Sequence, residues 1–340
     1  MPPLAQISHP AASSGLSGGG SWRWHALRRV YAMSAQRRLA FSGGFVPVEP
    51  ARRPVLFINP TSGGGKAQRA GLADLARERG IEPVTLAPGD ELETLIQGAV
   101  ADGADALGVA GGDGSLAVVA SAAAGRRIPF VCVPAGTRNH FARDVGVDPN
   151  DLIGALDAFG AALERTIDLG YVNGRPFLNN VSLGIYGDAV QRGDYRDAKL
   201  RALLETAEEE ALGSGSAPPD VRLVDDRGRE HRSPAVVLVS NNPYALARPR
   251  VRGARPGLDG GRLGIVLIDA PAGPPHRAAR AWSARSLSVD AGGTVPAGVD
   301  GEAVTLSPPL RFTIHPKALR VRIAPRHVRQ HGFLSHEPSA

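Results

Sequence analysis

Residues 55–66 read Val55-Leu56-Phe57-Ile58-Asn59-Pro60-Thr61-Ser62-Gly63-Gly64-Gly65-Lys66. An apolar, strand-like run therefore ends in a turn with three consecutive glycines, and a stretch with a helical pattern follows. A strand that passes through glycines into a helix presents unhindered backbone N–H groups at the positive end of the helix dipole, where anions bind. The stretch predicts a strand–turn–helix unit with a phosphate-binding turn.

Two similar turns follow along the chain. Leu107-Gly108-Val109-Ala110 leads into Gly111-Gly112-Asp113-Gly114-Ser115, and a third apolar run leads into Pro134-Ala135-Gly136-Thr137-Arg138-Asn139. A single glycine-rich turn says little, because glycine also makes ordinary tight turns. Three of them, each placed after a predicted strand, favour a polyphosphate site.

Strand and helix patterns alternate through the first half of the sequence. Predicted strands cover 54–60, 81–87, 106–110 and 128–133, predicted helices lie near 66–79, 90–102, 115–124 and 150–163, and a short segment at 137–146 follows the last strand. Such alternation predicts right-handed βαβ units and an open parallel sheet. Ligands of these sheets bind beyond the carboxyl ends of the strands, where all three glycine turns fall. We therefore expect a nucleotide-binding α/β domain over 53–165.

The pattern changes after about residue 165. Short β-rich runs occur at 177–185, 221–224, 235–240, 263–268, 286–289 and 311–314, hairpin signals occur at 172–175 and 225–228, and one helix is predicted near 195–212. We expect a mainly antiparallel β-sandwich over 166–325 that carries a helical insertion, with its last strands returning to the first domain. The predicted fold class is α/β plus β.

The composition is that of a soluble globular protein. The chain has 340 residues, of which 43% are hydrophobic and 21% charged, enough for two domains with a substantial core. No apolar run approaches the roughly 18 residues of a membrane span. The single cysteine, Cys132, excludes an intramolecular disulfide and fits a reducing compartment. We therefore expect a cytoplasmic protein.

Basic charge is concentrated at the two ends of the chain. Residues 1–50 hold five arginines and one acid, and residues 317–340 hold five Lys or Arg side chains and one acid. Each end thus carries +4 of a total of +6, which leaves about −2 for the body between them. We expect a disordered basic leader at 1–50 and a basic tail at 326–340. They suit peripheral association with an anionic membrane surface, or they are simply solvated.

The first two turns do not fit the standard phosphate loops. A P-loop needs a glycine where Pro60 stands and a Ser or Thr where Ala67 stands. Residues 112–117 do read G-x-G-x-x-A, but an acid at Asp113 would repel the pyrophosphate of a dinucleotide. An acid beside phosphate-binding glycines suits Mg²⁺–nucleotide chemistry. Asp113 is therefore interpreted as facing magnesium or an acceptor hydroxyl, with a purely turn-forming role as the alternative.

An acidic turn lies far downstream, at Val299-Asp300-Gly301-Glu302 between two predicted strands. Two carboxylates in one turn can direct one group at a hydroxyl and the other at a metal or water. By composition alone this is an ordinary hairpin turn. Only the three glycine turns make it a candidate for proton transfer.

Seven motifs in order resemble the diacylglycerol kinase catalytic-domain family, which includes bacterial lipid kinases and sphingosine and ceramide kinases and is distantly related to NAD kinases. The motifs are NPTSGGGK (59–66), GGDGS (111–115), PAGTRNHFAR (134–143), NNVSLGIYGDAV (179–190), VSNNPY (239–244), LDGGRLGI (258–265) and VDGE (299–302). The resemblance spans about residues 53–325. It implies a Rossmann-like N-terminal domain, a C-terminal β-sandwich, and ATP- and Mg²⁺-dependent phosphorylation of a lipid hydroxyl in phospholipid biosynthesis.

The resemblance also implies roles for individual residues. Glu302, with Asp300 beside it, stands in the segment that accepts the proton, and Asp113 lies in the central nucleotide loop. The residues expected to line ATP are Asn59, Thr61, Ser62, Gly63, Gly64, Gly65, Lys66, Gly111, Gly112, Gly114, Ser115, Gly136, Thr137 and Asn139. Lys66 is one of only three lysines in the chain, which makes it a specific candidate for the ATP phosphates.

The sequence departs from the family at two positions. His140 stands where the third loop usually has an acid, and Gly260 replaces the second acid of a segment that holds a structural metal in some bacterial members. Asp259 is then the one candidate ligand left there, and we do not expect that metal site to be intact. A sphingoid-base kinase, an NAD kinase and a catalytically silent nucleotide-binding regulatory protein stay open as alternatives. We expect a lipid partner and no nucleic acid, and a homodimer also stays open.

Overall fold

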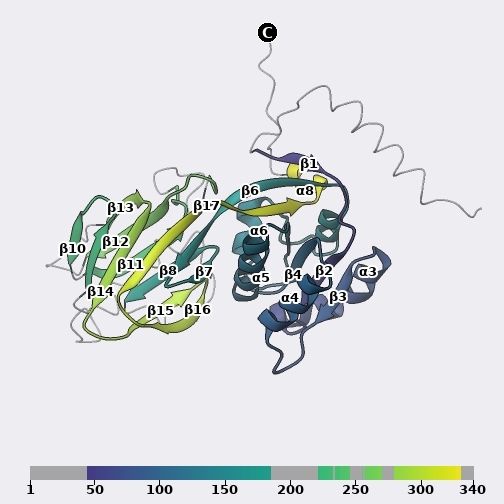
Figure 1. The fold of residues 1–340 in the computed structure, drawn as a ribbon, viewed down its shortest axis with the longest axis horizontal. Coiled ribbons are helices and arrows are strands. Elements are labelled where there is room, and N and C mark those ends of the chain that lie inside the picture. Colours follow the sequence, from purple (N-terminus) through teal and green to yellow (C-terminus); the bar gives the residue numbers. More distant parts are fainter. Residues whose placement is uncertain are drawn as a thin grey trace, which may run out of the picture. The chain divides into compact units, whose positions relative to one another are not determined.

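The computed structural model of the chain describes residues 44–184, 221–232, 234–245, 255, 257–269 and 279–330, all of which belong to one compact unit. Most of the expected leader, the helix expected near 195–212 and the end of the basic tail lie outside these residues. The described elements form two sheets with helices around one part of the first (Figure 1).

Four parallel strands form the N-terminal part of the first sheet. They are β2 (Pro54–Ile58), β3 (Glu82–Thr85), β4 (Ala106–Ala110) and β5 (Phe130–Val133), in the order β3-β2-β4-β5. The residues of β2, β4 and β5 are buried throughout, as in a parallel sheet that is covered on both faces. The prediction of a parallel α/β sheet is confirmed.

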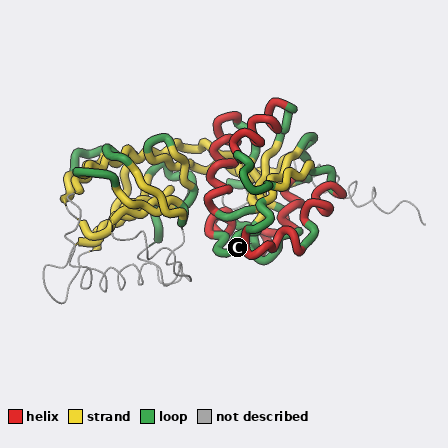
Figure 2. Tube along the Cα trace, turned by 90° about the horizontal axis from the view of Figure 1, so that it is seen from below, coloured by secondary structure: helices red, strands yellow, loops and turns green. Residues whose placement is uncertain are grey.

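Helices lie on both faces of these strands (Figure 2). They are α2 (Ser62–Arg69), α3 (Leu72–Glu78), α4 (Leu92–Ala101), α5 (Asp113–Arg126) and α6 (His140–Val145). The chain moves from β2 to β3 in one direction and from β3 past β2 to β4 in the other, so right-handed crossovers place successive helices on opposite faces. The turns after β2 and β4 flank the point where the strand order reverses, which is where such sheets bind ligands.

The helix expected at 150–163 is wrong. Residues Gly154–Phe159 form a 3-10 helix, η1, and the chain is already extended in β6 (Ala162–Val172). The ring of Phe159 lies against Gly108 in β4, where a Cβ would overlap it. Long-range pairing of β6 with β17 (Leu310–Ile323) supplies hydrogen bonds that a continued helix would lose. Tertiary contacts thus override the local helical pattern.

Strands β6 and β17 run side by side and take part in both halves of the first sheet (Figure 1). The C-terminal end of β17 pairs in parallel with β5, and its N-terminal end pairs with β14 (Ser286–Ala291). The sheet continues through β9 (Val221–Asp225) to β10 (Glu230–Arg232). The domain boundary expected after residue 165 falls inside β6.

Part of the expected disordered leader is ordered. Strand β1 (Val46–Val48) pairs antiparallel with β6, so the expectation of disorder up to residue 50 is wrong for this segment. Phe45 is buried, and the guanidinium of Arg165 lies 4.9 Å from the centre of its ring. Two interactions explain why this short segment is ordered: the ring of Phe45 is buried, and β1 hydrogen-bonds to an edge of β6 that is otherwise unpaired there.

The second sheet is antiparallel and has six strands. Its order is β13 (Ala279–Ala284), β12 (Leu263–Asp269), β11 (Pro234–Asn241), β8 (Asn180–Gly184), β15 (Val295–Val299) and β16 (Glu302–Leu306). The hairpins predicted at 172–175 and 225–228 are confirmed, the first by pairing of β6 with β7 (Arg175–Phe177) and the second by pairing of β9 with β10.

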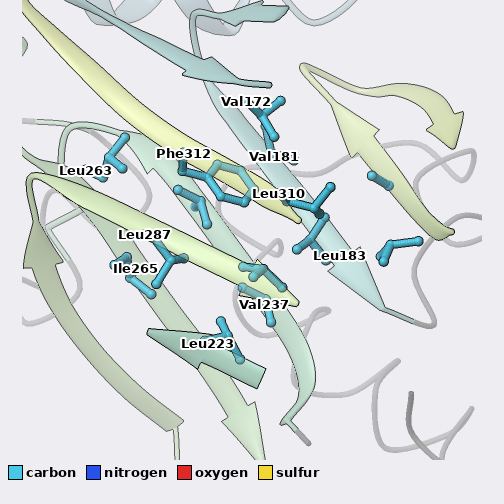
Figure 3. Close-up of a cluster of buried hydrophobic side chains, with 14 of the residues drawn as sticks. Val172, Val181, Leu183, Leu223, Val237, Leu263, Ile265, Leu287, Leu310 and Phe312 are labelled. Carbon is cyan, nitrogen blue, oxygen red and sulfur yellow. The ribbon is translucent and has the colours of Figure 1, made fainter. Parts of the chain in front are cut away.

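Alternating apolar side chains of the two sheets form one buried core (Figure 3). Leu263 and Ile265 of β12 point to the same interior as Leu287 of β14 and Phe312 of β17. This core also buries Val299, the last residue of β15, so the acidic turn that follows starts from a fixed point. None of the helices in the described ranges has the length and hydrophobicity that crossing a bilayer requires.

Candidate active site

The three glycine turns meet at the carboxyl edge of the parallel strands. A Cβ on Gly63 would overlap the carbonyl oxygen of Ala135, which brings the first turn against the third. A Cβ on Gly136 would lie 3.0 Å from the carbonyl oxygen of Gly111, which brings the third turn against the second. Glycine is needed at both positions because a side chain would collide with the backbone of the neighbouring turn. The predicted convergence of the three turns is confirmed.

The first turn is left-handed. Gly63, Gly64 and Gly65 have φ values of 56°, 68° and 84°, a conformation that side-chain-bearing residues rarely adopt. These glycines thus form a turn, and regular helical residues begin after them, as expected for a helix that starts near 66. The helix expected at 66–79 is interrupted, however, because Gly71 (φ 60°) separates α2 from α3.

Polar side chains of the first turn form hydrogen bonds within this turn and to neighbouring loops. The Oδ1 atom of Asn59 accepts hydrogen bonds from the N–H of Thr61 (3.1 Å) and from its hydroxyl (2.9 Å). The ammonium of Lys66 donates to the carbonyl oxygens of Pro134 (3.2 Å) and Pro149 (3.0 Å). Lys66 thus ties the first turn to the third in this structure, a role the sequence does not indicate.

The second turn has the geometry of an anion site. Gly112 is the extended residue before α5 (φ −82°, ψ 172°), and Asp113 is the first helical residue. The helix has 14 residues, which is long enough for a developed helix dipole with its positive end at these first N–H groups. The backbone N–H groups at the start of α5 therefore carry the partial positive charge of a helix N-terminus.

The third turn, between β5 and α6, adds further polar groups. Asn139 has φ 49° and its amide Nδ2 donates to the carbonyl oxygen of Pro134 at 3.3 Å. Thr137 is exposed at the tip of the turn. A Cβ on Gly301 would lie 3.6 Å from Nη1 of Arg138, which places this arginine beside the acidic turn.

Glu302 reaches the second glycine turn from the other sheet. A Cβ on Gly114 would overlap the Oε1 atom of Glu302 and lie 3.0 Å from Oε2. Oε2 accepts a hydrogen bond from Nη2 of Arg175 at 3.1 Å, and the Glu302 side chain is 54% exposed. Glu302 is therefore a solvent-accessible carboxylate at the start of α5, with a cation beside it.

Asp300 is directed inward instead. Its carboxylate accepts hydrogen bonds from three consecutive backbone N–H groups, those of Leu178 (2.7 Å), Asn179 (2.7 Å) and Asn180 (3.0 Å). The pKa of Asp300 is raised to about 7, chiefly by burial and also by the negative charge of Asp113, while the three N–H bonds oppose the shift. The two acids of the turn thus have different surroundings, which the sequence alone does not separate.

This pKa predicts a pH dependence of stability. An unfolded aspartate has a pKa near 4, so between about pH 4 and pH 7 the folded protein binds a proton that the unfolded chain has lost. We expect the wild type to lose stability relative to Asp300→Asn as the pH rises through this range, by roughly 1.4 kcal/mol per pKa unit. Urea unfolding of both proteins measures the difference, and a difference that stays flat contradicts the raised pKa.

A cavity of about 590 Å³ opens beside Glu302. One wall comes from the start of α4 and from α5, and the other from β7 and β15. The lining residues are Leu92, Glu93, Gly114, Ser115, Ala117, Val118, Ser121, Ala122, Arg175, Pro176, Val299, Asp300 and Glu302. Small side chains on α5 leave this space, whose size is that of a small-molecule site.

The contact between Gly114 and Glu302 can be tested directly. Gly114→Ala should lower kcat of the phosphoryl transfer that the sequence resemblance implies about 10²-fold by pushing the carboxylate aside, with little change in melting temperature because Glu302 is exposed and can move. Gly125→Ala in the same helix, where a Cβ would meet nothing within 4 Å, is the matched control. Equal activities of the two variants would show that catalysis does not depend on where the Glu302 carboxylate lies.

Asp259 lies apart from these groups. It is exposed, and its negative charge acts on the half-buried Arg165. Burial lowers the pKa of the Arg165 guanidinium, and the charge of Asp259 opposes this shift. The adjoining loop is held by buried Asp168, which accepts hydrogen bonds from the N–H groups of Gly261 (2.6 Å) and Lys317 (2.8 Å). Within the described ranges, no cluster of three or more His, Cys, Asp or Glu side chains could hold a metal ion.

Sequence reasoning missed three functional neighbours. Arg175 was visible only as the end of a hairpin signal, and neither Asp168 nor Arg255 belongs to a predicted element or motif. Each acts across more than 75 residues of sequence, on Glu302, on the 258–261 loop and on Leu178 respectively. No local pattern marks such partners, because spacing along one element says nothing of what another sheet brings to it.

Comparison with known proteins finds similarity to lipid kinases. Residues 53–172 match the diacylglycerol kinase catalytic domain. A diacylglycerol kinase of Mycobacterium tuberculosis is 38% identical over 120 residues, which is 34% of this chain and 39% of that protein. A probable YegS-like lipid kinase of Pseudomonas aeruginosa is 28% identical over 302 residues, covering 79% of this chain and 93% of the relative.

A crystal structure of a diacylglycerol kinase from Bacillus anthracis has the same fold. It superposes with a TM-score of 0.55 at 18% identity and covers 81% of this chain and 98% of that one. The α/β domain with a following antiparallel sheet is therefore the architecture of this group. Over residues 53–172 the chain is similar to the diacylglycerol kinase catalytic domain, and its fold is that of the Bacillus anthracis structure.

Proposed function

We propose that the protein is a kinase that transfers the γ-phosphoryl group of ATP to the hydroxyl of diacylglycerol or a similar lipid. The observation that carries the proposal is the approach of Glu302 to Gly114. It joins an exposed carboxylate from one sheet to the anion-binding start of α5 from the other. Phosphoryl transfer needs both, an electrostatic cradle for the phosphates and a base for the acceptor hydroxyl.

The cavity beside Glu302 is the proposed place of the nucleotide. Its walls are mostly small or apolar, as suits a nucleoside, and at one end it meets Gly114 and Ser115 at the start of α5. There the N–H groups of the second turn would bind phosphate oxygens. The first and third turns, which touch the second, would complete the phosphate site through their own N–H groups and hydroxyls.

Glu302 is the proposed general base. It would take the proton of the lipid hydroxyl as the hydroxyl oxygen bonds to the γ-phosphorus and the bond from phosphorus to the bridging oxygen of ADP breaks. Arg175 at 3.1 Å keeps a cation beside this carboxylate. Asp300, held by three N–H groups, fixes the turn that aims Glu302.

Magnesium would come with the nucleotide. The described residues offer single carboxylates near the phosphate site rather than a cage, and Mg²⁺ is commonly held by one or two carboxylates, waters and substrate phosphates. Asp113, the first residue of α5, is the proposed protein ligand. The ion would neutralise phosphate charge.

The cavity assignment predicts the effect of a bulky residue. Ala122→Phe should raise KM for ATP about tenfold or more by filling the space, while kcat at saturating ATP changes little. Ala122→Ser, which keeps the cavity open, should match the wild type. Steady-state kinetics with varied ATP separates the two. An unchanged KM in Ala122→Phe would place the nucleotide elsewhere.

The proposed activity is tested with γ-labelled ATP and a total bacterial lipid extract, followed by identification of the labelled product. Phosphatidic acid is the expected product. Parallel reactions with sphingosine and with NAD address the alternative kinases. Label in a phosphorylated sphingoid base or in NADP alone would assign the acceptor differently, and nucleotide binding without transfer to any acceptor would indicate a silent regulatory protein.

A further inference from the structure

A buried arginine lies behind the acidic turn. The Arg255 side chain is 0% exposed and that of its partner Asp144 is 3% exposed. Two guanidinium nitrogens, Nη2 at 2.6 Å and Nε at 2.8 Å, donate to the same Oδ2 atom of Asp144. A guanidinium buried in this way is stable only if its N–H groups have hydrogen-bond acceptors and its charge has a partner.

The remaining N–H groups of Arg255 are directed at the backbone beside Asp300. Nη1 donates to the carbonyl oxygens of Leu178 (2.5 Å) and Asn241 (2.7 Å), and Nη2 donates to Oδ1 of Asn179 (3.0 Å). A lysine has no planar fork and cannot reproduce this set of bonds. Buried ion pairs are often replaceable by apolar residues without loss of stability, so stability alone does not account for this arrangement.

One peptide group connects Arg255 to Asp300. The carbonyl of Leu178 accepts from Arg255, and the N–H of the same peptide, on Asn179, donates to Asp300 at 2.7 Å. Hydrogen bonds in such a chain polarise one another, so the guanidinium strengthens the bond on the far side. Arg255 thus both places and polarises the donors that hold Asp300.

Arg255 also reaches the third glycine turn. Its partner Asp144 belongs to α6, which begins directly after Asn139 of that turn. The same side chain is therefore bonded to the helix behind one phosphate turn and to the segment 178–180 that holds the acidic turn. It connects the two halves of the proposed site.

We propose that Arg255 is a positioning residue for phosphoryl transfer, which fixes the 178–180 segment and through Asp300 sets the place of Glu302 relative to the glycine turns. The inference rests on the proposed function. It assigns to Arg255 a role in kcat without contact to either substrate.

The test compares Arg255→Lys with Arg322→Lys. Arg322 is a second buried arginine, whose Nε donates to Glu164 at 3.0 Å, with no bond to the acidic turn among its described contacts. We expect Arg255→Lys to lower kcat for lipid phosphorylation about tenfold or more, with KM for ATP within about threefold of the wild type. Amide hydrogen exchange at 178–180 should become about tenfold faster. Arg322→Lys should leave all three quantities near their wild-type values.

Three outcomes would overturn the inference. They are wild-type kcat in a folded Arg255→Lys variant, unchanged exchange at 178–180, and an equal loss of kcat in Arg322→Lys. Should Arg255→Lys not fold, Asp144→Asn weakens the same ion pair and is expected to give the same split between kcat and KM. A wild type that phosphorylates no acceptor refutes the proposed function itself, whereas an active wild type with an equally active Arg255→Lys refutes only the role of Arg255.

Discussion

Glu302→Gln is expected to lower kcat for lipid phosphorylation about 10³-fold while leaving KM for ATP and the melting temperature nearly unchanged. The amide has the shape of the carboxylate but cannot take a proton from the acceptor hydroxyl. Because the side chain is 54% exposed, its neutral form is readily solvated, and we expect a stability change within about 0.5 kcal/mol.

Glu93→Gln is the matched control for this variant. Glu93 lines the same cavity and carries the same charge, but it comes from the start of α4, and no contact to the acidic turn is described for it. If the loss in Glu302→Gln came only from a changed charge in the cavity, both variants would lose activity alike. Wild-type turnover in Glu302→Gln would remove Glu302 from the mechanism.

Asp113→Asn is expected to cause a loss of similar size, about 10²- to 10³-fold in kcat, because it removes the carboxylate proposed to hold magnesium at the start of α5. Asp113→Asn should also change the pKa of a neighbouring group. The charge of Asp113 raises the pKa of Asp300, so the pKa of Asp300 should fall in the variant. The pH range over which Asp300 affects unfolding should then move to lower pH.

Asp102→Asn controls for the general effect of removing a carboxylate. Asp102 is exposed at the end of α4, so its loss should change neither kcat nor the pH dependence of unfolding. Kinetics at several magnesium concentrations and urea unfolding at pH 4 to 7 measure both signatures of Asp113→Asn. An active Asp113→Asn protein with an unshifted pKa of Asp300 would reduce Asp113 to a turn-forming residue.

Much of the fold follows from local patterns. The four parallel strands and the three turns after them were predictable because alternation of strand and helix is a property of short segments, and glycine marks the turns. The helix expected at 150–163 failed because contacts with β17 and Gly108, both distant in sequence, decide that segment. The order of β1 likewise depends on an open edge of β6.

The sequence predicted which residues lie at the candidate site better than it predicted what each of them does there. Asp300 and Glu302 look alike in sequence, yet three N–H donors hold one of them inside and a glycine makes room for the other at the start of α5. Lys66, expected on phosphate, donates to two carbonyl oxygens instead. These differences come from hydrogen-bond partners that belong to other elements.

The most direct measurement is a single-turnover reaction of the wild-type protein with γ-labelled ATP, magnesium and micelles of a short-chain diacylglycerol. We predict that label appears in phosphatidic acid at the rate at which ADP forms, and that Glu302→Gln binds ATP but transfers no label on that timescale. Label that remains in ATP, or that appears only in inorganic phosphate with the wild type, would contradict the assignment of this site to lipid phosphorylation.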